Sequence, residues 1–211
     1  REKCGGKVTV ITMGPPQADA ALREAISLGA DEAVLVSDRA FAGSDTWATS
    51  YVLSQAIRKL GQYDVVICGK QTLDGDTGQV GPGIAESLKI PFIAYVSKIE
   101  EIKDGYIRVQ RMIEEGHEII EASLPAVITV SKEINVPRLP SIRGTIKRKS
   151  ANIPLWSDAD IGAKAEKAGL NGSPTRVVKI FFPKRERKSE MLSGSCEEQV
   201  DKLIKKLEGI V

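Results

Sequence analysis

The first 130 residues alternate between short apolar runs and segments whose apolar residues recur at helical spacing. The apolar runs at 7–13, 32–37 and 63–68 predict strands, and the segments at 17–28, 44–60 and 78–88 predict helices. Strands and helices that alternate at this length are typical of a doubly wound α/β fold with a parallel sheet. The run at 63–68 is β-branched without polar alternation, so we expect an interior strand that is covered on both faces.

A different pattern begins at residue 92, where apolar and polar residues start to alternate along strands. Residues 92–100, 106–113 and 117–122 predict three antiparallel strands, and Asp104-Gly105 is typical of a hairpin turn between the first two. Residues 127–130 are apolar again and should return to the parallel sheet. Together these patterns predict one α/β domain over residues 1–134.

The periodic pattern stops after Lys132. Prolines at 137, 140 and 154, with basic residues at 143 and 147–149, predict an extended arm over residues 135–193. Residues 194–211 predict an amphipathic helix that starts at Gly194 or Ser195. Its apolar stripe needs a cover, and the pattern alone leaves its own domain and a partner subunit equally open. The stripe consists of Val200, Leu203, Ile204 and Leu207.

The loop after the strand at 63–68 has the chemistry of an anion site. It reads GKQTLDGDTGQVGP over residues 69–82. Glycines let a backbone approach a ligand closely, and the amides that open the following helix can donate to a phosphate. The loop lacks the GxGxxG spacing of a dinucleotide fold and does not end in GKS or GKT. The residues alone therefore leave a plain turn and a nucleotide site open.

Composition and charge narrow the functional classes. The chain has 211 residues, of which 42% are hydrophobic and 27% charged, and its formal net charge is only +2. Aromatic residues are sparse near the basic tracts at 143–149 and 184–188, so we expect solvated linkers and no nucleic acid partner. No apolar run is long enough to span a membrane, and we expect a cytoplasmic protein, or a mitochondrial matrix protein in a eukaryote.

No residue pattern indicates catalysis by the chain's own side chains. Cys4, Cys68 and Cys196 are far apart and form no metal-binding pair, and Cys68 ends an apolar strand as a core residue would. The single histidine, His117, has no serine or cysteine motif around it and falls where a hairpin should turn. We therefore expect neither a metal site nor a catalytic residue.

The loop at 69–82 resembles the signature of the β subunit of electron transfer flavoproteins, which holds an adenine nucleotide with this loop. Residues 8–15, 25–33, 124–130, 137–144 and 153–156 are similar to other segments of that family. The sequence is therefore identified as a member, and the resemblance implies a Rossmann-like, adenine nucleotide-binding domain. Its Asp-Gly-Asp-Thr form is more similar to the members that bind a second FAD than to those that hold AMP.

The resemblance also implies roles for single residues. Thr72 would lie beside the adenosine, with Met13 and Gly14 at the neighbouring strand end. Ile142 would be the apolar anchor for a dehydrogenase, next to Leu139, where many members carry a tyrosine; this leaves the choice of dehydrogenase open. The phosphate loop would comprise Asp76, Thr77, Gly78, Gln79, Val80 and Gly81.

As a member, the chain would form a heterodimer with an α subunit whose FAD lies at the shared surface. It would carry electrons from an acyl-CoA or other flavin dehydrogenase, and would take part in NADH oxidation if it bifurcates electrons. The resemblance also implies a strand, a loop and a helix ahead of residue 1 that contribute to the nucleotide pocket.

Two other classes remain as alternatives. A stand-alone adenine nucleotide sensor of the universal stress protein type should lack the proline-rich arm. An enzyme that splits or adenylates with ATP should carry an SGGxDS-type loop, and the present residues contain none.

Overall fold

A computed structural model describes residues 5–73, 75–182 and 189–208 of the chain. The chain divides into two compact units, residues 1–176 and residues 177–211, and each is described by itself. The basic tract at 184–188 and Cys4 lie outside the described residues.

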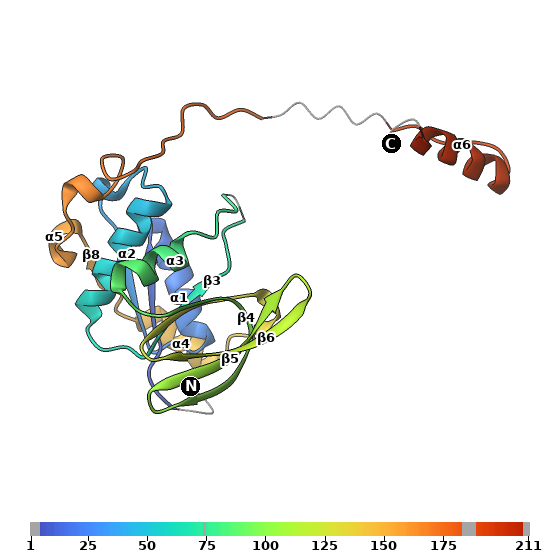
Figure 1. The fold of residues 1–211 in the computed structure, drawn as a ribbon. Coiled ribbons are helices and arrows are strands. Elements are labelled where there is room, and N and C mark those ends of the chain that lie inside the picture. The colour runs from blue at the N-terminus through green and yellow to red at the C-terminus, as the bar shows by residue number, and fades with distance from the viewer. Residues whose placement is uncertain (1–4, 74, 183–188, 209–211) are drawn as a thin grey trace. The chain divides into compact units, whose positions relative to one another are not determined.

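The first half of the first unit is a regular alternation of strands and helices (Figure 1). Asp45 begins α2 because its carboxylate accepts hydrogen bonds from the N–H groups of Trp47 and Ala48, at 3.0 and 3.1 Å. The predicted elements at 7–88 are all present, with ends that shift by at most two residues. They are β1 (Thr9–Met13), α1 (Asp19–Leu28), β2 (Glu32–Val36), α2 (Thr46–Leu60), β3 (Val65–Gly69) and α3 (Val80–Leu88), with short 3-10 turns η1 (Pro16–Ala18) and η2 (Arg39–Phe41).

Helices cover both faces of the sheet at β2. Successive side chains of a strand point to opposite faces. Leu35 of β2 packs with Leu22 of α1, whereas Val34 and Val36 pack with Val52 of α2. Because these residues alternate along β2, α1 and α2 must lie on opposite faces. This arrangement confirms the predicted α/β fold class.

The strands form two sheets, in the orders β1-β2-β8 and β3-β7-β4-β5-β6. The first sheet is parallel throughout, and in the second sheet β3, β7 and the start of β4 are parallel while β4, β5 and β6 form the predicted antiparallel meander. Ile11 of β1 shares an apolar cluster with Val66 of β3 and with residues of α2 and α3, which joins the two sheets. The remaining strands are β4 (Phe92–Lys103), β5 (Tyr106–Ile113), β6 (Gly116–Ser123), β7 (Ala126–Val130) and β8 (Leu155–Trp156).

The position of β3 differs from the interior strand that its sequence predicts. Among the described residues β3 pairs with β7 alone, so it lies at an edge of its sheet. The Ile67 side chain is 60% exposed, while Val66 packs under α2 and α3. One apolar face of β3, which includes Ile67, is therefore not covered by the described neighbours.

The segment predicted as an extended arm is partly helical and joins the first unit. Ser141 caps α4 (Ile142–Ser150) by accepting a hydrogen bond of 2.9 Å from the Gly144 N–H. A methyl group at Gly144 would lie 2.1 Å from the Ser27 carbonyl oxygen, so glycine permits α4 to cross α1 closely. The sequence pattern missed this helix because its few apolar residues leave it mostly exposed.

Beyond α4 the chain stays on the first unit up to residue 176, rather than leaving it at 134. The 3-10 turn η3 (Lys132–Ile134) precedes α4. After α4, β8 pairs with β2, and α5 (Asp158–Ile161) and the 3-10 turn η4 (Ala165–Lys167) follow. The Asp45 N–H donates to the Ser173 hydroxyl at 2.9 Å, and the Thr175 N–H donates to the Asp45 carboxylate at 3.0 Å.

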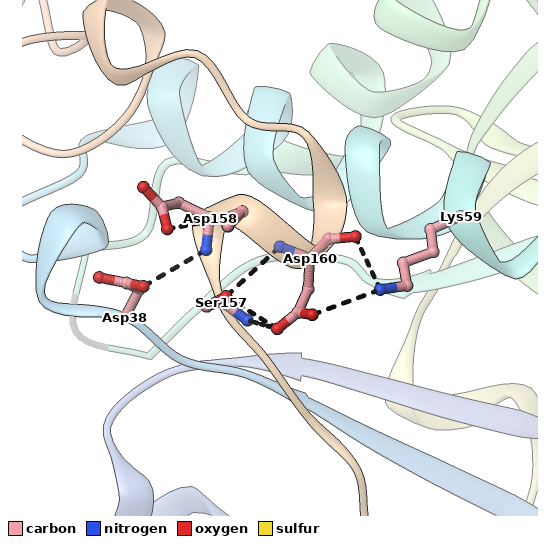
Figure 2. A network of polar contacts seen from close by, with 6 residues as sticks. Asp38, Lys59, Ser157, Asp158 and Asp160 are labelled. Carbon is pink, nitrogen blue, oxygen red and sulfur yellow. Dashed lines mark hydrogen bonds and ion pairs between the residues drawn. The ribbon is translucent and has the colours of Figure 1, made fainter.

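Figure 2 shows how the start of α5 is held to the domain. Ser157 and Asp160 form a reciprocal capping box, in which the Ser157 N–H donates to the Asp160 carboxylate at 2.8 Å. The Asp158 N–H donates to the Asp38 carboxylate at 3.3 Å, and the Lys59 ammonium donates to the Asp160 carbonyl at 2.7 Å. These contacts fix residues 157–160 against the ends of β2 and α2.

The second unit contains the predicted C-terminal helix, α6 (Cys196–Glu208). Ser195 and Glu198 cap it reciprocally, with the Ser195 N–H donating to the Glu198 carboxylate at 3.0 Å and the Glu198 N–H to the Ser195 hydroxyl at 3.3 Å. Its apolar stripe is about half exposed, at 54% for Val200 and 48% for Leu203.

Candidate functional site

The loop between β3 and α3 is shaped by its own side chains and by β7. The Lys70 N–H donates to the Val130 carbonyl at 3.0 Å, which fixes the start of the loop at the end of β7. Within the loop, the Gly75 N–H donates to the Thr72 hydroxyl at 3.3 Å, and the Gln71 amide donates to the Asp76 carboxylate. The Asp76 carboxylate thus links the end of the loop to Gln71 near its start.

The backbone turns sharply where the loop meets α3. Asp76 has φ +49° and Gly78 has φ +61°, both in the left-handed region that favours glycine. The carbonyl of Lys70 would lie 3.5 Å from a methyl group at Gly78, so the conformation, more than the space, requires glycine there. These two turns direct the chain into the first residue of α3.

The first amides of α3 are left without a side-chain cap. Gln79 begins the helix but makes no capping hydrogen bond, because its side-chain oxygen accepts instead from the Thr46 hydroxyl of α2 at 2.8 Å. The first N–H groups of a helix have no acceptor within it, and the Gln79 side chain supplies none for those of Val80 and Gly81, of which Gly81 is buried. Pro82 contributes no amide.

Two glycines bring α3 close to its neighbours. A methyl group at Gly81 would lie 2.5 Å from the Thr129 methyl of β7, and one at Gly83 would lie 2.4 Å from the Ser50 hydroxyl of α2. The Ser50 hydroxyl also donates to the Val80 carbonyl at 3.3 Å. The start of α3 is thus held between β7 and α2, so its amides have a fixed direction.

Lys70 and Tyr95 lie beside this helix start, and sequence reasoning assigned neither. The Lys70 ammonium lies 5.1 Å from the centre of the Tyr95 ring. The Tyr95 N–H donates to the Thr129 hydroxyl at 3.1 Å, which places Tyr95 next to the strand residue that Gly81 contacts. The only sequence signal was that Lys70 is the one basic residue between residues 60 and 88.

The other site predictions lie at the end of β1. The Gly14 N–H donates to the Val36 carbonyl at 3.1 Å, and Met13 packs on the cluster around Val36 and Phe41. These contacts join Met13 and Gly14 to β2. Their proposed contact with a nucleotide stays a prediction. Burial raises the pKa of the Cys68 thiol, which keeps it protonated and supports a core role at the end of β3.

The two residues predicted to dock a dehydrogenase are exposed. Leu139 is 88% exposed in the segment before α4, and Ile142 is 84% exposed as its first residue. Ile146, one turn further along α4, is 65% exposed. Docking itself stays a prediction, but both apolar side chains are available for it.

Other classes of site find no support in the part of the chain that the structure describes. No group of three or more histidine, cysteine or acidic residues there could hold a metal ion. No helix in those ranges is long and apolar enough to cross a membrane. His117 lies at the start of β6, exposed, and pairs with Met112 of β5.

Comparisons with known proteins show the family of the chain. The family described as electron transfer flavoprotein domain matches residues 1–161. The chain is 50% identical over 208 residues to the electron transfer flavoprotein subunit beta of Thermoanaerobacterium thermosaccharolyticum, and the match covers 98% of the chain and 79% of that relative.

Two further relatives carry other names. The caffeyl-CoA reductase-Etf complex subunit CarD of Acetobacterium woodii is 46% identical, over 94% of the chain and 76% of the relative. The protein FixA of Azotobacter vinelandii is also 46% identical, over 92% of the chain and 72% of the relative.

Proposed function

The chain belongs to the electron transfer flavoprotein family, as a relative of its β subunits, and on this premise we propose that it binds an adenine nucleotide at the start of α3 and carries electrons together with an α subunit. The observation that carries the nucleotide site is the uncapped start of α3, where the side chain of Gln79 is turned away toward Thr46. The backbone N–H groups of Val80 and Gly81 would then donate to the phosphate.

The described residues fit an adenine nucleotide phosphate better than a bare turn. A methyl group at Gly81 would lie 2.5 Å from the Thr129 methyl of β7, so glycine lets the start of α3 approach the strand closely, as a phosphate loop requires. Thr77 and Thr72 supply hydroxyls for phosphate and ribose oxygens. Asp76 would bond a hydroxyl or order the loop, because its charge opposes that of a phosphate. Met13 and Gly14 would border the adenosine from the end of β1.

The nucleotide would be AMP or the adenylate half of a second FAD, since both present the same phosphate and adenosine to the loop. When bound, flavin supplies the redox chemistry, and the residues of this chain position it and exclude water. The catalytic groups are therefore those of the cofactors, and the chain acts as a carrier. A second FAD would open the route to electron bifurcation, in which the complex oxidises NADH.

The proposed partners use different parts of the chain. Leu139 and Ile142 are exposed apolar side chains beside basic residues, which suits transient docking of an acyl-CoA or other flavin dehydrogenase. The half-exposed stripe of α6 would pack on the α subunit, whose FAD lies at the shared surface. The cytoplasm is the compartment that we propose for this complex.

A stand-alone nucleotide sensor of the stress-protein type is the less favoured alternative. Such a sensor would need neither exposed docking residues at the start of α4 nor an amphipathic helix with an uncovered stripe. The family assignment also disfavours an ATP-splitting enzyme.

Co-expression with the α subunit tests the proposal. We expect a 1:1 complex that contains flavin and an adenine nucleotide, which absorbance and mass spectrometry of the extracted cofactors would identify. A stable monomer of the chain that ignores the α subunit and contains no flavin would overturn the electron-carrier assignment and favour the sensor.

A further inference from the structure

Tyr95 has a backbone conformation that bulky residues rarely adopt. Its φ is +59°, in the left-handed region, and its side chain is 44% exposed. Tyr95 lies in β4 at a break in register, where Ile93 pairs with Ile128 and Val96 pairs with Val130 of β7. The strand bends at this point, between its parallel part and the antiparallel hairpin.

The bend alone does not explain a tyrosine. Glycine would adopt a positive φ without steric cost, and a strand bulge that only changes direction commonly uses it. Strained residues that persist in a fold cluster at binding and active sites, so an observed outlier supports a hypothesis of function. The side chain of Tyr95 must therefore contribute something that glycine cannot.

The neighbours of Tyr95 connect it to the proposed phosphate site. Its N–H donates to the Thr129 hydroxyl at 3.1 Å, and the methyl group of Thr129 faces the Cα of Gly81. Thr129 is only 2% exposed, so this link between Tyr95 and the start of α3 is fixed in the core. The Tyr95 ring is thus held at the edge of the loop by buried contacts.

The Tyr95 ring supports the one basic side chain of the loop. Lys70 is the sole lysine or arginine between residues 60 and 88, and its ammonium lies 5.1 Å from the ring centre. Its N–H donates to the Val130 carbonyl at 3.0 Å. The Glu133 carboxylate of η3 also attracts its ammonium, so the Tyr95 ring and Glu133 both act on this flexible four-carbon side chain. A cation over an aromatic ring is attracted by the electrons of the ring face.

We propose that Tyr95 is a positioning residue of the nucleotide site, whose ring holds the Lys70 ammonium where it meets the phosphate at the start of α3. This inference rests on the proposed nucleotide site and adds its source of positive charge. The amides of Val80 and Gly81 supply only partial charge, and Asp76 adds a negative one, so a phosphate gains from a full cation. Lys70 acts on the phosphate, and Tyr95 acts through Lys70.

Calorimetric titration of the co-expressed complex of this chain with its α subunit, freed of bound nucleotide, with AMP and with adenosine tests this proposal. Tyr95→Leu should weaken AMP binding by roughly threefold to tenfold and leave adenosine binding unchanged, because adenosine has no phosphate. Tyr95→Phe keeps the ring and should bind AMP like the parent. In a Lys70→Met background, Tyr95→Leu should have no further effect on AMP.

Two other variants separate positioning from folding. Tyr95→Gly relieves the left-handed strain, so it should be at least as stable as the parent to heat yet bind AMP as weakly as Tyr95→Leu. Lys59→Met removes another ring-stacked lysine, 4.6 Å from the Trp156 ring, and should leave AMP binding unchanged.

The outcomes distinguish this inference from the proposed function. Suppose that the parent binds AMP. If Tyr95→Leu then binds AMP equally well, or if its adenosine affinity falls as much as its AMP affinity, the inference is overturned while the site stands. The inference is also overturned if Tyr95→Leu lowers the AMP affinity equally in the parent and in the Lys70→Met background. If the parent binds no AMP, the proposed site fails and the inference fails with it.

Discussion

The hydroxyl of Thr46 donates a hydrogen bond of 2.8 Å to the side-chain oxygen of Gln79, which joins the first residue of α2 to the residue that begins α3. The side-chain oxygen of a glutamine at a helix start could otherwise accept a hydrogen bond from a backbone N–H of the first turn. Because its side chain accepts from Thr46, it caps neither the Val80 nor the Gly81 N–H. The contact also brings the loops that follow β2 and β3 together.

The stability of the chain should fall in acid. Hydrogen bonds, first from the Ala40 N–H and also from the Asp158 N–H, hold the pKa of Asp38 below its ordinary 3.8. Burial opposes such a shift at Asp45, but N–H groups of Ala48 and Thr175 lower its pKa overall. A carboxyl with a lowered folded pKa binds its proton more weakly when folded, so its stabilisation is present above the unfolded pKa. It is lost as pH falls through the folded value.

Urea unfolding between pH 7 and pH 2 measures this effect. We expect the free energy of unfolding to decline below about pH 4, and Asp38→Asn to make the decline shallower. An acid dependence that is the same in the variant would show that Asp38 does not contribute.

Gly144→Ala should destabilise the first unit by about 1–3 kcal/mol. Alanine favours a helix by about 1 kcal/mol over glycine, but its methyl group would lie 2.1 Å from the backbone oxygen of Ser27. The clash should win because a backbone atom cannot move aside easily. Gly69→Ala is the control, since nothing lies within 4 Å of its new methyl group. Equal thermal midpoints for both variants would contradict the close crossing of α4 and α1.

The alternation of strands and helices was predictable from sequence because each element buries an apolar face. The exposed helix α4 was not, since it depends on the Ser141 cap and on the room that Gly144 leaves next to Ser27. The boundary at 176 was also missed, because polar contacts such as Thr175 to Asp45 hold the segment, and these leave no periodic pattern.

Ile142→Ala should slow electron delivery from the dehydrogenase without changing flavin content. Removal of an exposed anchor costs on the order of 1–3 kcal/mol in binding if it is a hot spot, which raises the half-saturating concentration. Ile119→Ala is a matched control, because Ile119 is 65% exposed on β6. Unchanged saturation kinetics for Ile142→Ala would assign this residue a role outside docking.

The stripe of α6 should be needed for assembly with the α subunit. A double change of Leu203 and Leu207 to serine should weaken the complex, as should removal of the chain from Ser195 onward. The same change at Lys202 and Lys205 costs a similar helix propensity on charged positions and should leave the complex intact. Sedimentation of the co-expressed subunits measures the difference. Equal dissociation of both double variants would contradict a role of the stripe.

The candidate site was only partly predictable. The loop at 69–82 is a continuous pattern, so its residues could be proposed as a site from the sequence alone. Tyr95 is distant in sequence and reaches the loop only because β4 pairs beside β7 and bends at a left-handed residue. No period in the sequence encodes that bend.

The nucleotide content of the purified complex tests the central claim most directly. Gly78→Val forces a β-branched residue into φ +61° at the loop, and Gly105→Val does the same at φ +90° in a hairpin turn with nothing within 4 Å. We expect the parent and Gly105→Val to retain the same amount of adenine nucleotide, measured after extraction, and Gly78→Val to lose it while remaining folded. Equal nucleotide content in all three proteins would contradict a phosphate site at the start of α3.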